Sequence, residues 1–149
     1  MKFIADVMLG SLAKRMRLLG IDVLYDRTLE DNEIIRFSLE QDRVILTRDR
    51  ALSDRPLASS HLLIKSDLLK EQVEQVLSAF PRKMPLNPLS RCSECNELLD
   101  RITREEARDL VPQYVYENQD LFLRCPRCKR TYWHGTHVMR MAIPGRRKK

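Results

Sequence analysis

Apolar residues in the first 79 positions follow two alternating patterns. Short apolar runs have the length of β-strands, and they cover residues 2–5, 22–25, 44–47 and 61–64. Between them, apolar residues recur every three or four positions, the period of a helix with one buried face, over residues 9–19, 31–41 and 67–79. Strands that alternate with helices predict an α/β fold: a short parallel sheet covered by helices in three layers.

Residues at the ends of these segments support the assignment. Gly20 ends the first helical pattern, and Asp31 suits the first turn of the second, where a carboxylate complements free amides and the helix dipole. The run 44–47 is continuously apolar, as expected of a strand covered on both faces.

The composition changes after residue 80. Three prolines in the segment PRKMPLNPLS predict an extended linker, because proline cannot continue a helix. The sequence therefore predicts an α/β domain over residues 1–80, a Pro-rich linker over 81–90, a small Cys-containing module over 91–141 and a basic tail over 142–149.

Two Cys-x-x-Cys pairs dominate the second half. Each tight turn can direct two thiolates at one ion, so we expect structural zinc held by Cys92, Cys95, Cys125 and Cys128. A closed four-Cys site has no open position and therefore performs no chemistry. Residues 114–116 and 120–123 are candidate strands of such a zinc ribbon. Two alternatives are a redox dithiol and replacement of one Cys ligand by His134 or His137.

Composition restricts the class of protein. The chain has 149 residues, of which 43% are hydrophobic and 32% charged, which is typical of a globular chain with a highly charged surface. No run of about 18 apolar residues is present, and Asp6 interrupts the N-terminus before a signal-peptide core could form. We therefore expect a cytoplasmic protein without a membrane partner.

The positive charge belongs to the second half. The chain carries a formal net charge of +6 and has a pI near 9.4. Residues 1–80 contain 12 Lys and Arg against 13 Asp and Glu, giving −1, whereas residues 81–149 contain 15 against 8, giving +7. A polyanion such as RNA would be attracted to the second half.

Three acidic residues follow the predicted strands. Asp6 ends the first strand, Asp49 follows the third, and Asp31 begins the helix after the second. If the strand order is 2-1-3-4, Asp6 and Asp49 share the switch point where ligands bind to open parallel sheets, with Asp31 at the rim. Clustered carboxylates suit Mg²⁺ or Mn²⁺, which can activate water and stabilise an in-line displacement. The alternative is that each acid only caps a turn or pairs with a neighbouring arginine.

Several segments together resemble one known family. In the first half these are DVMLGSLA (6–13), LLGID (18–22) and LTRDR (46–50). In the second half they are SRCSECN (90–96) and CPRCKRTYWHGTH (125–137). Over roughly residues 2–141 the chain thus resembles the Mut-seven C-terminal RNase family, whose PIN-like ribonuclease domain carries an appended zinc ribbon.

This resemblance implies a PIN-like fold and a ribonuclease that depends on Mg²⁺ or Mn²⁺. By analogy, Asp6, Asp31 and Asp49 carry the metal and Thr47 assists through its hydroxyl. The chain departs from PIN nucleases in one respect: the segment after the first helix is too short to hold a further acid. Either Asp26 or Glu33 substitutes for that acid, or the site has fewer ligands.

The resulting hypothesis is an endonucleolytic ribonuclease whose ribbon helps to bind RNA. The candidate RNA-contacting residues are Lys14, Arg17, Arg48, Arg127 and Trp133. The alternative is an RNA- or ribonucleoprotein-binding module with a weak or inactive PIN-like domain, whose ribbon aromatics stack on unpaired bases. The same aromatics could instead pack the small core of the ribbon. A DNA nuclease would differ only in its substrate.

Overall fold

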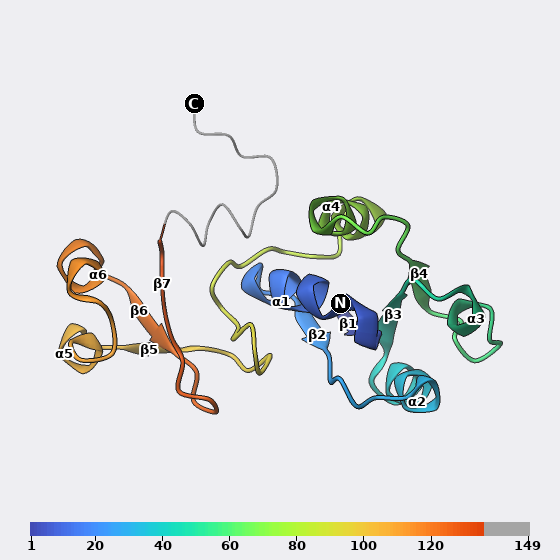
Figure 1. Ribbon diagram of the computed structural model, residues 1–149, viewed down its shortest axis with the longest axis horizontal. Helices are drawn as coiled ribbons and strands as arrows, with labels where there is room; N and C mark the ends of the chain where they lie inside the picture. Colours follow the sequence, from blue (N-terminus) through green and yellow to red (C-terminus); the bar gives the residue numbers. More distant parts are fainter. Residues whose placement is uncertain (136–149) are drawn as a thin grey trace.

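Two β-sheets organise the chain in a computed structural model that describes residues 1–135. The first sheet is parallel, has the order β2-β1-β3-β4, and contains β1 (Lys2–Ala5), β2 (Asp22–Leu24), β3 (Arg43–Thr47) and β4 (His61–Leu63). The second is antiparallel, has the order β5-β6-β7, and contains β5 (Asp100–Ile102), β6 (Phe122–Arg124) and β7 (Thr131–Trp133) (Figure 1). The expected α/β class and strand order are confirmed.

Helices cover both faces of the parallel sheet. The 3₁₀ turn η1 (Val7–Leu9), α1 (Gly10–Leu18) and α4 (Leu69–Ala79) pack on one face, and α2 (Asp31–Gln41) and α3 (Arg50–Ser53) on the other (Figure 1). Side chains alternate across the sheet: Phe3 and Ala5 contact the α1 side, whereas Ile4 contacts the α2 side. The predicted three layers therefore enclose two apolar clusters. No helix within residues 1–135 is both long and apolar enough to cross a bilayer.

The sequence predicted the elements of the first sheet closely but missed α3. This four-residue helix is too short to show periodicity, and it begins where the Asp49 carboxylate accepts a hydrogen bond from the Ala51 amide. The helix predicted over 67–79 begins two residues later, at Leu69.

One strand prediction in the second half is wrong. Residues 114–116 lie in the helix α6 (Gln113–Asn118), which follows α5 (Arg104–Ala107). Val115 is buried while Tyr114 is 68% exposed, so the alternation that predicted a strand comes from one buried face of a helix. The strand predicted over 120–123 begins only at Phe122, which is fully buried.

The proline-containing segment packs back against α1. The Asn87 and Leu89 amides donate hydrogen bonds to the carbonyls of Leu19 and Leu18. Gly20 lies at this crossing with φ +87°, and a Cβ there would be 2.3 Å from the Asn87 carbonyl oxygen. Gly20 thus ends α1, as predicted, and also admits the close approach of this segment.

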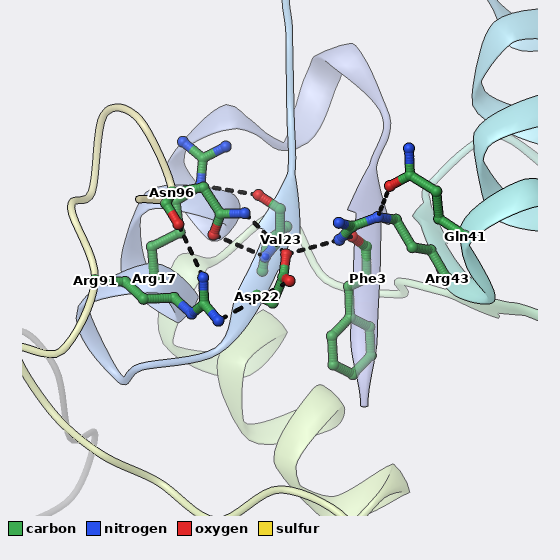
Figure 2. Close-up of polar contacts among 8 residues, drawn as sticks. All are labelled: Phe3, Arg17, Asp22, Val23, Gln41, Arg43, Arg91 and Asn96. Atoms are coloured by element: carbon green, nitrogen blue, oxygen red, sulfur yellow. Dashed lines mark hydrogen bonds and ion pairs between the residues drawn. The ribbon is translucent and has the colours of Figure 1, made fainter. Parts of the chain in front are cut away.

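The second half of the chain completes the open edge of β2. The Val23 amide, on the side of β2 away from β1, donates to the side-chain oxygen of Asn96 at 3.1 Å (Figure 2). The Asn96 amide nitrogen donates in turn to Asp22 Oδ1 at 2.8 Å. The side chain of Asn96 therefore takes the place that a neighbouring strand would occupy.

Arg17 satisfies the other backbone group of the same strand residue. Its Nε donates to the Val23 carbonyl at 2.9 Å (Figure 2). Its Nη1 donates to the carbonyls of Ser93 and Glu94 at 3.0 and 3.2 Å. The side chain is almost completely buried, so the guanidinium joins α1, β2 and the turn after Cys92.

Asp22 is the acidic member of this network. Arg43 donates to its Oδ1 at 2.7 Å and also to the Phe3 carbonyl, while Arg91 lies 4.0 Å from its Oδ2 (Figure 2). Burial alone would raise the pKa of Asp22, but the hydrogen bonds from Arg43 and Asn96 outweigh that effect, and the pKa lies below its ordinary value. The ionised carboxylate is therefore favoured in the folded protein.

Replacing Asn96 with Gly tests this docking. Asn96 has φ 65°, which Gly adopts freely, so the substitution removes only the side-chain hydrogen bonds. We expect a loss of about 1–3 kcal/mol in the free energy of unfolding, because the buried Val23 amide loses its acceptor. Urea unfolding followed by circular dichroism measures this loss.

The second Cys turn supplies a matched control. Lys129 has φ 66° at the equivalent position, and its side chain is exposed. Lys129→Gly should change stability by less than about 0.5 kcal/mol. Equal effects of the two substitutions would show that the Asn96 side chain does not support β2.

Candidate functional site

Two acids and a threonine meet where β1 and β3 end. Thr47 Oγ1 donates to Asp6 Oδ2 at 2.9 Å and accepts a hydrogen bond from the Asp49 amide at the same distance. The other Asp6 oxygen accepts from the Val7 amide at 2.7 Å. Asp6 is 5% exposed and Thr47 is fully buried. The Thr47 hydroxyl therefore links the Asp6 carboxylate to the Asp49 backbone.

Sheet topology explains why these residues meet. The adjacent strands β1 and β3 are parallel, with Ala5 opposite Leu46, so the residues that follow them leave the sheet side by side. From β1 the chain continues into α1 on one face, and from β3 into α3 on the other. This divergence at the carboxyl ends is the switch point expected to bind ligands in an open parallel sheet.

Asp31 does not belong to this hydrogen-bonded group in the described part of the chain. It is exposed in the first turn of α2, behind the capping box that Glu30 and Glu33 form. Within residues 1–135, no hydrogen bond joins Asp31 to Asp6 or Asp49, and these acids do not form a set of three whose ligand atoms all lie within 4.8 Å.

The two candidates for a further acid serve local structure. Asp26 Oδ1 accepts from the amide and hydroxyl of Thr28, which lowers the pKa of Asp26. The Glu33 carboxylate accepts from the Glu30 amide at 2.9 Å. These contacts indicate a turn and a helix cap.

The oxygen groups at the β1–β3 edge fit a hard cation with few protein ligands. Mg²⁺ is commonly held by one or two carboxylates while keeping several waters. Asp6 and Asp49 could supply such a pair, with the carboxylate of Asp6 already oriented by two hydrogen bonds. Asp49 Oδ1 is likewise oriented by the Ala51 amide at 2.8 Å.

The four cysteines form a second candidate metal site. The Sγ atoms of Cys92, Cys95, Cys125 and Cys128 all lie within 4.8 Å of one another, which is the only such group of His, Cys, Asp or Glu ligands in residues 1–135. This donor set fits a tetrahedral ion such as zinc. His134 is outside the group, and His137 lies outside the described residues, as does the predicted basic tail.

Both Cys turns have the same backbone geometry. The amide of the first Cys donates to the carbonyl five residues later, from Cys92 to Glu97 at 2.8 Å and from Cys125 to Arg130 at 2.9 Å. In each turn the residue after the second Cys has a positive φ. The repeated Cys-x-x-Cys spacing is thus a repeated structure, with two turns directed at one point.

The close packing of the four cysteines changes the pKa of one of their thiols. Burial, together with hydrogen bonding to Cys128, raises the pKa of Cys95 to about 12. Tyr132 lies beside this group, with its hydroxyl 3.1 Å from Cys92 Sγ. A cation that replaces the thiol protons would relieve the cost of gathering four thiolates.

The predicted RNA-contacting residues have different surroundings. Arg17 is buried against the first Cys turn, and Lys14 pairs with Glu94 of that turn at 3.3 Å. Trp133 packs against the apolar cluster of the second sheet. Arg48 and Arg127 are exposed, although Arg127 lies 3.9 Å from Glu97.

Comparison with known proteins gives one family. The sequence model described as "Mut7-C RNAse domain" matches residues 1–143. No curated protein matches the chain. The matched range includes both the acidic edge and the four cysteines.

Removing metal tests the four-Cys site. We expect one zinc ion per chain by elemental analysis, and a strong chelator should shift the fluorescence of the chain's single tryptophan to longer wavelength, because Trp133 packs in the ribbon. Zn²⁺ should restore the spectrum and Mg²⁺ should not.

A pair of variants assigns the ligands. Cys95→Ser should lower the zinc content, whereas His134→Ala should leave it unchanged. Loss of zinc in the His134 variant would contradict a site made only of cysteines.

Proposed function

Because the chain belongs to the Mut7-C RNAse domain family, we propose that it hydrolyses RNA phosphodiesters at the Asp6–Thr47–Asp49 edge with the help of Mg²⁺ or Mn²⁺. The observation that carries this proposal is the Thr47 hydroxyl, which is hydrogen-bonded to both acidic positions at the switch point of the sheet. In this proposal residues 1–80 form a PIN-like nuclease domain, 81–90 a linker, and 91–141 a zinc ribbon that contacts RNA.

The chain's own groups supply positioning. The Val7 amide and the Thr47 hydroxyl hold the two Asp6 oxygens, and the Ala51 amide holds Asp49. A divalent cation, when bound, activates water and stabilises charge on the phosphodiester. Because these carboxylates are held in place before the reaction, they need not reorganise during it. Such preorganisation is the main source of electrostatic stabilisation in enzymes. In this arrangement Asp31 is an acid at the rim of the site, and Arg48 contacts a phosphate of the RNA.

Charge supports a contribution of the ribbon to RNA binding. Residues 81–149 contain 15 Lys and Arg against 8 Asp and Glu, a balance of +7 that zinc-bound thiolates would reduce. Arg127, Lys129 and Arg130 are exposed around the second Cys turn. Such a surface attracts phosphates independently of sequence. Trp133 is occupied in the ribbon core, so the exposed Tyr114 is the aromatic side chain better placed to stack on a base.

A binding module with a weak nuclease domain is the second candidate. It is favoured because Asp6, Asp31 and Asp49 do not form a close group of three ligands within residues 1–135, and fewer ligands hold a cation less firmly. Tight RNA binding without cleavage in Mg²⁺ or Mn²⁺ would support this candidate.

Substitution of the paired acids tests catalysis. Asp6→Asn and Asp49→Asn keep the shape of the side chains but remove their charge, and each should lower the rate of RNA cleavage about 100-fold or more. Labelled RNA and DNA incubated with metal-stripped protein and added Mn²⁺ provide the measurement and show the preferred substrate.

The control for this experiment lies at the opposite end of β3. Asp42 caps the end of α2 with φ 53°, a conformation that Asn also accepts, so Asp42→Asn should cleave normally. Unchanged Mn²⁺-dependent cleavage by Asp6→Asn would rule out the proposed site.

Neutralising the ribbon tests its role in binding. The double change Arg127→Ala and Lys129→Ala should weaken RNA binding and reduce the slope of log affinity against log salt by about 0.7 for each lost phosphate contact. The cleavage rate of bound RNA should stay the same. The matched control is Lys2→Ala with Arg36→Ala, which removes the same charge elsewhere on the surface. Equal salt slopes for both double variants would contradict a specific contribution of the ribbon.

A further inference from the structure

A small hollow opens at the same edge of the sheet as the proposed catalytic residues. Its volume is about 250 Å³, and three segments that follow the carboxyl ends of β1, β3 and β4 line it. Its lining includes Met8, Leu9, Leu12, Arg48, Asp67 and Gln72. Met8 lies two residues beyond Asp6, and Arg48 lies between Thr47 and Asp49. The hollow is therefore adjacent to the proposed site of hydrolysis.

The hollow combines an apolar floor with a polar rim. Leu9 and Leu12 are buried, whereas Met8 is 70% exposed at its mouth. The flexible, polarisable thioether of Met8 suits contact with an aromatic ring. Gln72 donates from Nε2 to the Ser66 carbonyl at 2.9 Å, which fixes its amide oxygen as an acceptor.

Size limits what can bind there. Pockets that enclose a complete small-molecule ligand usually measure roughly 300–1,000 Å³. A smaller hollow accepts one planar group that belongs to a larger molecule. Arg48 is exposed and lines the hollow, so its guanidinium is available to a phosphate attached to that planar group.

We propose that the hollow accepts one unpaired nucleobase of the RNA strand, next to the phosphodiester at the Asp6–Thr47–Asp49 edge. This inference rests on the proposed function and specifies its substrate as single-stranded RNA. A base in a duplex is stacked and paired, so it cannot enter a hollow with an apolar floor unless it leaves the helix. Asp67 and Gln72 also line the hollow and offer oxygen acceptors to the edges of the base.

Binding can be tested separately from cleavage. In the Asp6→Asn background, a short single-stranded RNA that carries 4-thiouridine should cross-link under ultraviolet light to the peptide containing Met8. Adding Met8→Ala should weaken binding of the same RNA about tenfold in fluorescence anisotropy. Leu39→Ala, which changes a similarly exposed apolar side chain on α2, should leave the affinity unchanged. Cross-links that avoid the lining residues, or equal affinities of the two variants, would overturn the proposal.

Cleavage gives the second measurement. The unmodified protein should cut an unpaired strand at least tenfold faster than the same strand in a duplex, and Met8→Ala should raise KM more than it lowers kcat. An active enzyme that cuts duplexes equally fast, with normal kinetics in Met8→Ala, would refute the hollow and leave the nuclease function intact. An inactive protein that still cross-links at Met8 would refute the nuclease function and retain the nucleobase site.

Discussion

Capture of the open β2 edge by the first Cys turn is the interaction on which the rest of this structure depends. An edge strand presents unpaired amides and carbonyls that need partners. Here the Val23 amide is satisfied by Asn96 and the Val23 carbonyl by Arg17, whose guanidinium also binds the Cys turn. Asn96 can reach β2 because the turn places it in the left-handed conformation. The geometry that gathers the cysteines therefore also completes the parallel sheet.

Charge gives this interface a second constraint. Within residues 1–135 the hydrogen bonds of Arg17 go to carbonyl oxygens, and no carboxylate of this part of the chain forms an ion pair with it. Burial lowers the pKa of Arg17, and the charges of Cys92 and Glu94 act in the opposite direction. Four thiolates around a divalent ion retain a net charge of −2, which keeps a negative charge near the guanidinium. Arg17 and a metal bound by the four cysteines would thus stabilise one another.

The sequence predicted those features of the fold that depend on a local pattern of residues or on the order of the strands. Alternating runs gave the parallel sheet, and the order 2-1-3-4 placed Asp6 beside the end of β3. It did not distinguish the buried Arg17 from the exposed Lys14, because helical periodicity predicts the direction of a side chain but not which distant segment packs against it. The role of Asn96 could not be predicted either, because its contact with β2 joins residues more than 70 positions apart in the sequence. The predicted strand at 114–116 failed because a helical turn can bury Val115 as well as a strand can.

The same edge strand connects the ribbon with the acidic site. Tyr25, directly after β2, donates its hydroxyl to the Val7 carbonyl at 2.9 Å, one residue from Asp6. A Cβ on Gly10 would lie 2.8 Å from this hydroxyl, so the sequence keeps room for the contact. Asn96 therefore supports β2, and Tyr25 at the end of β2 supports the turn that carries Asp6. A closed four-Cys site has no position for substrate. Zinc bound there would accordingly affect the proposed hydrolysis through the placement of this turn or through RNA binding by the ribbon, and not through chemistry at the metal.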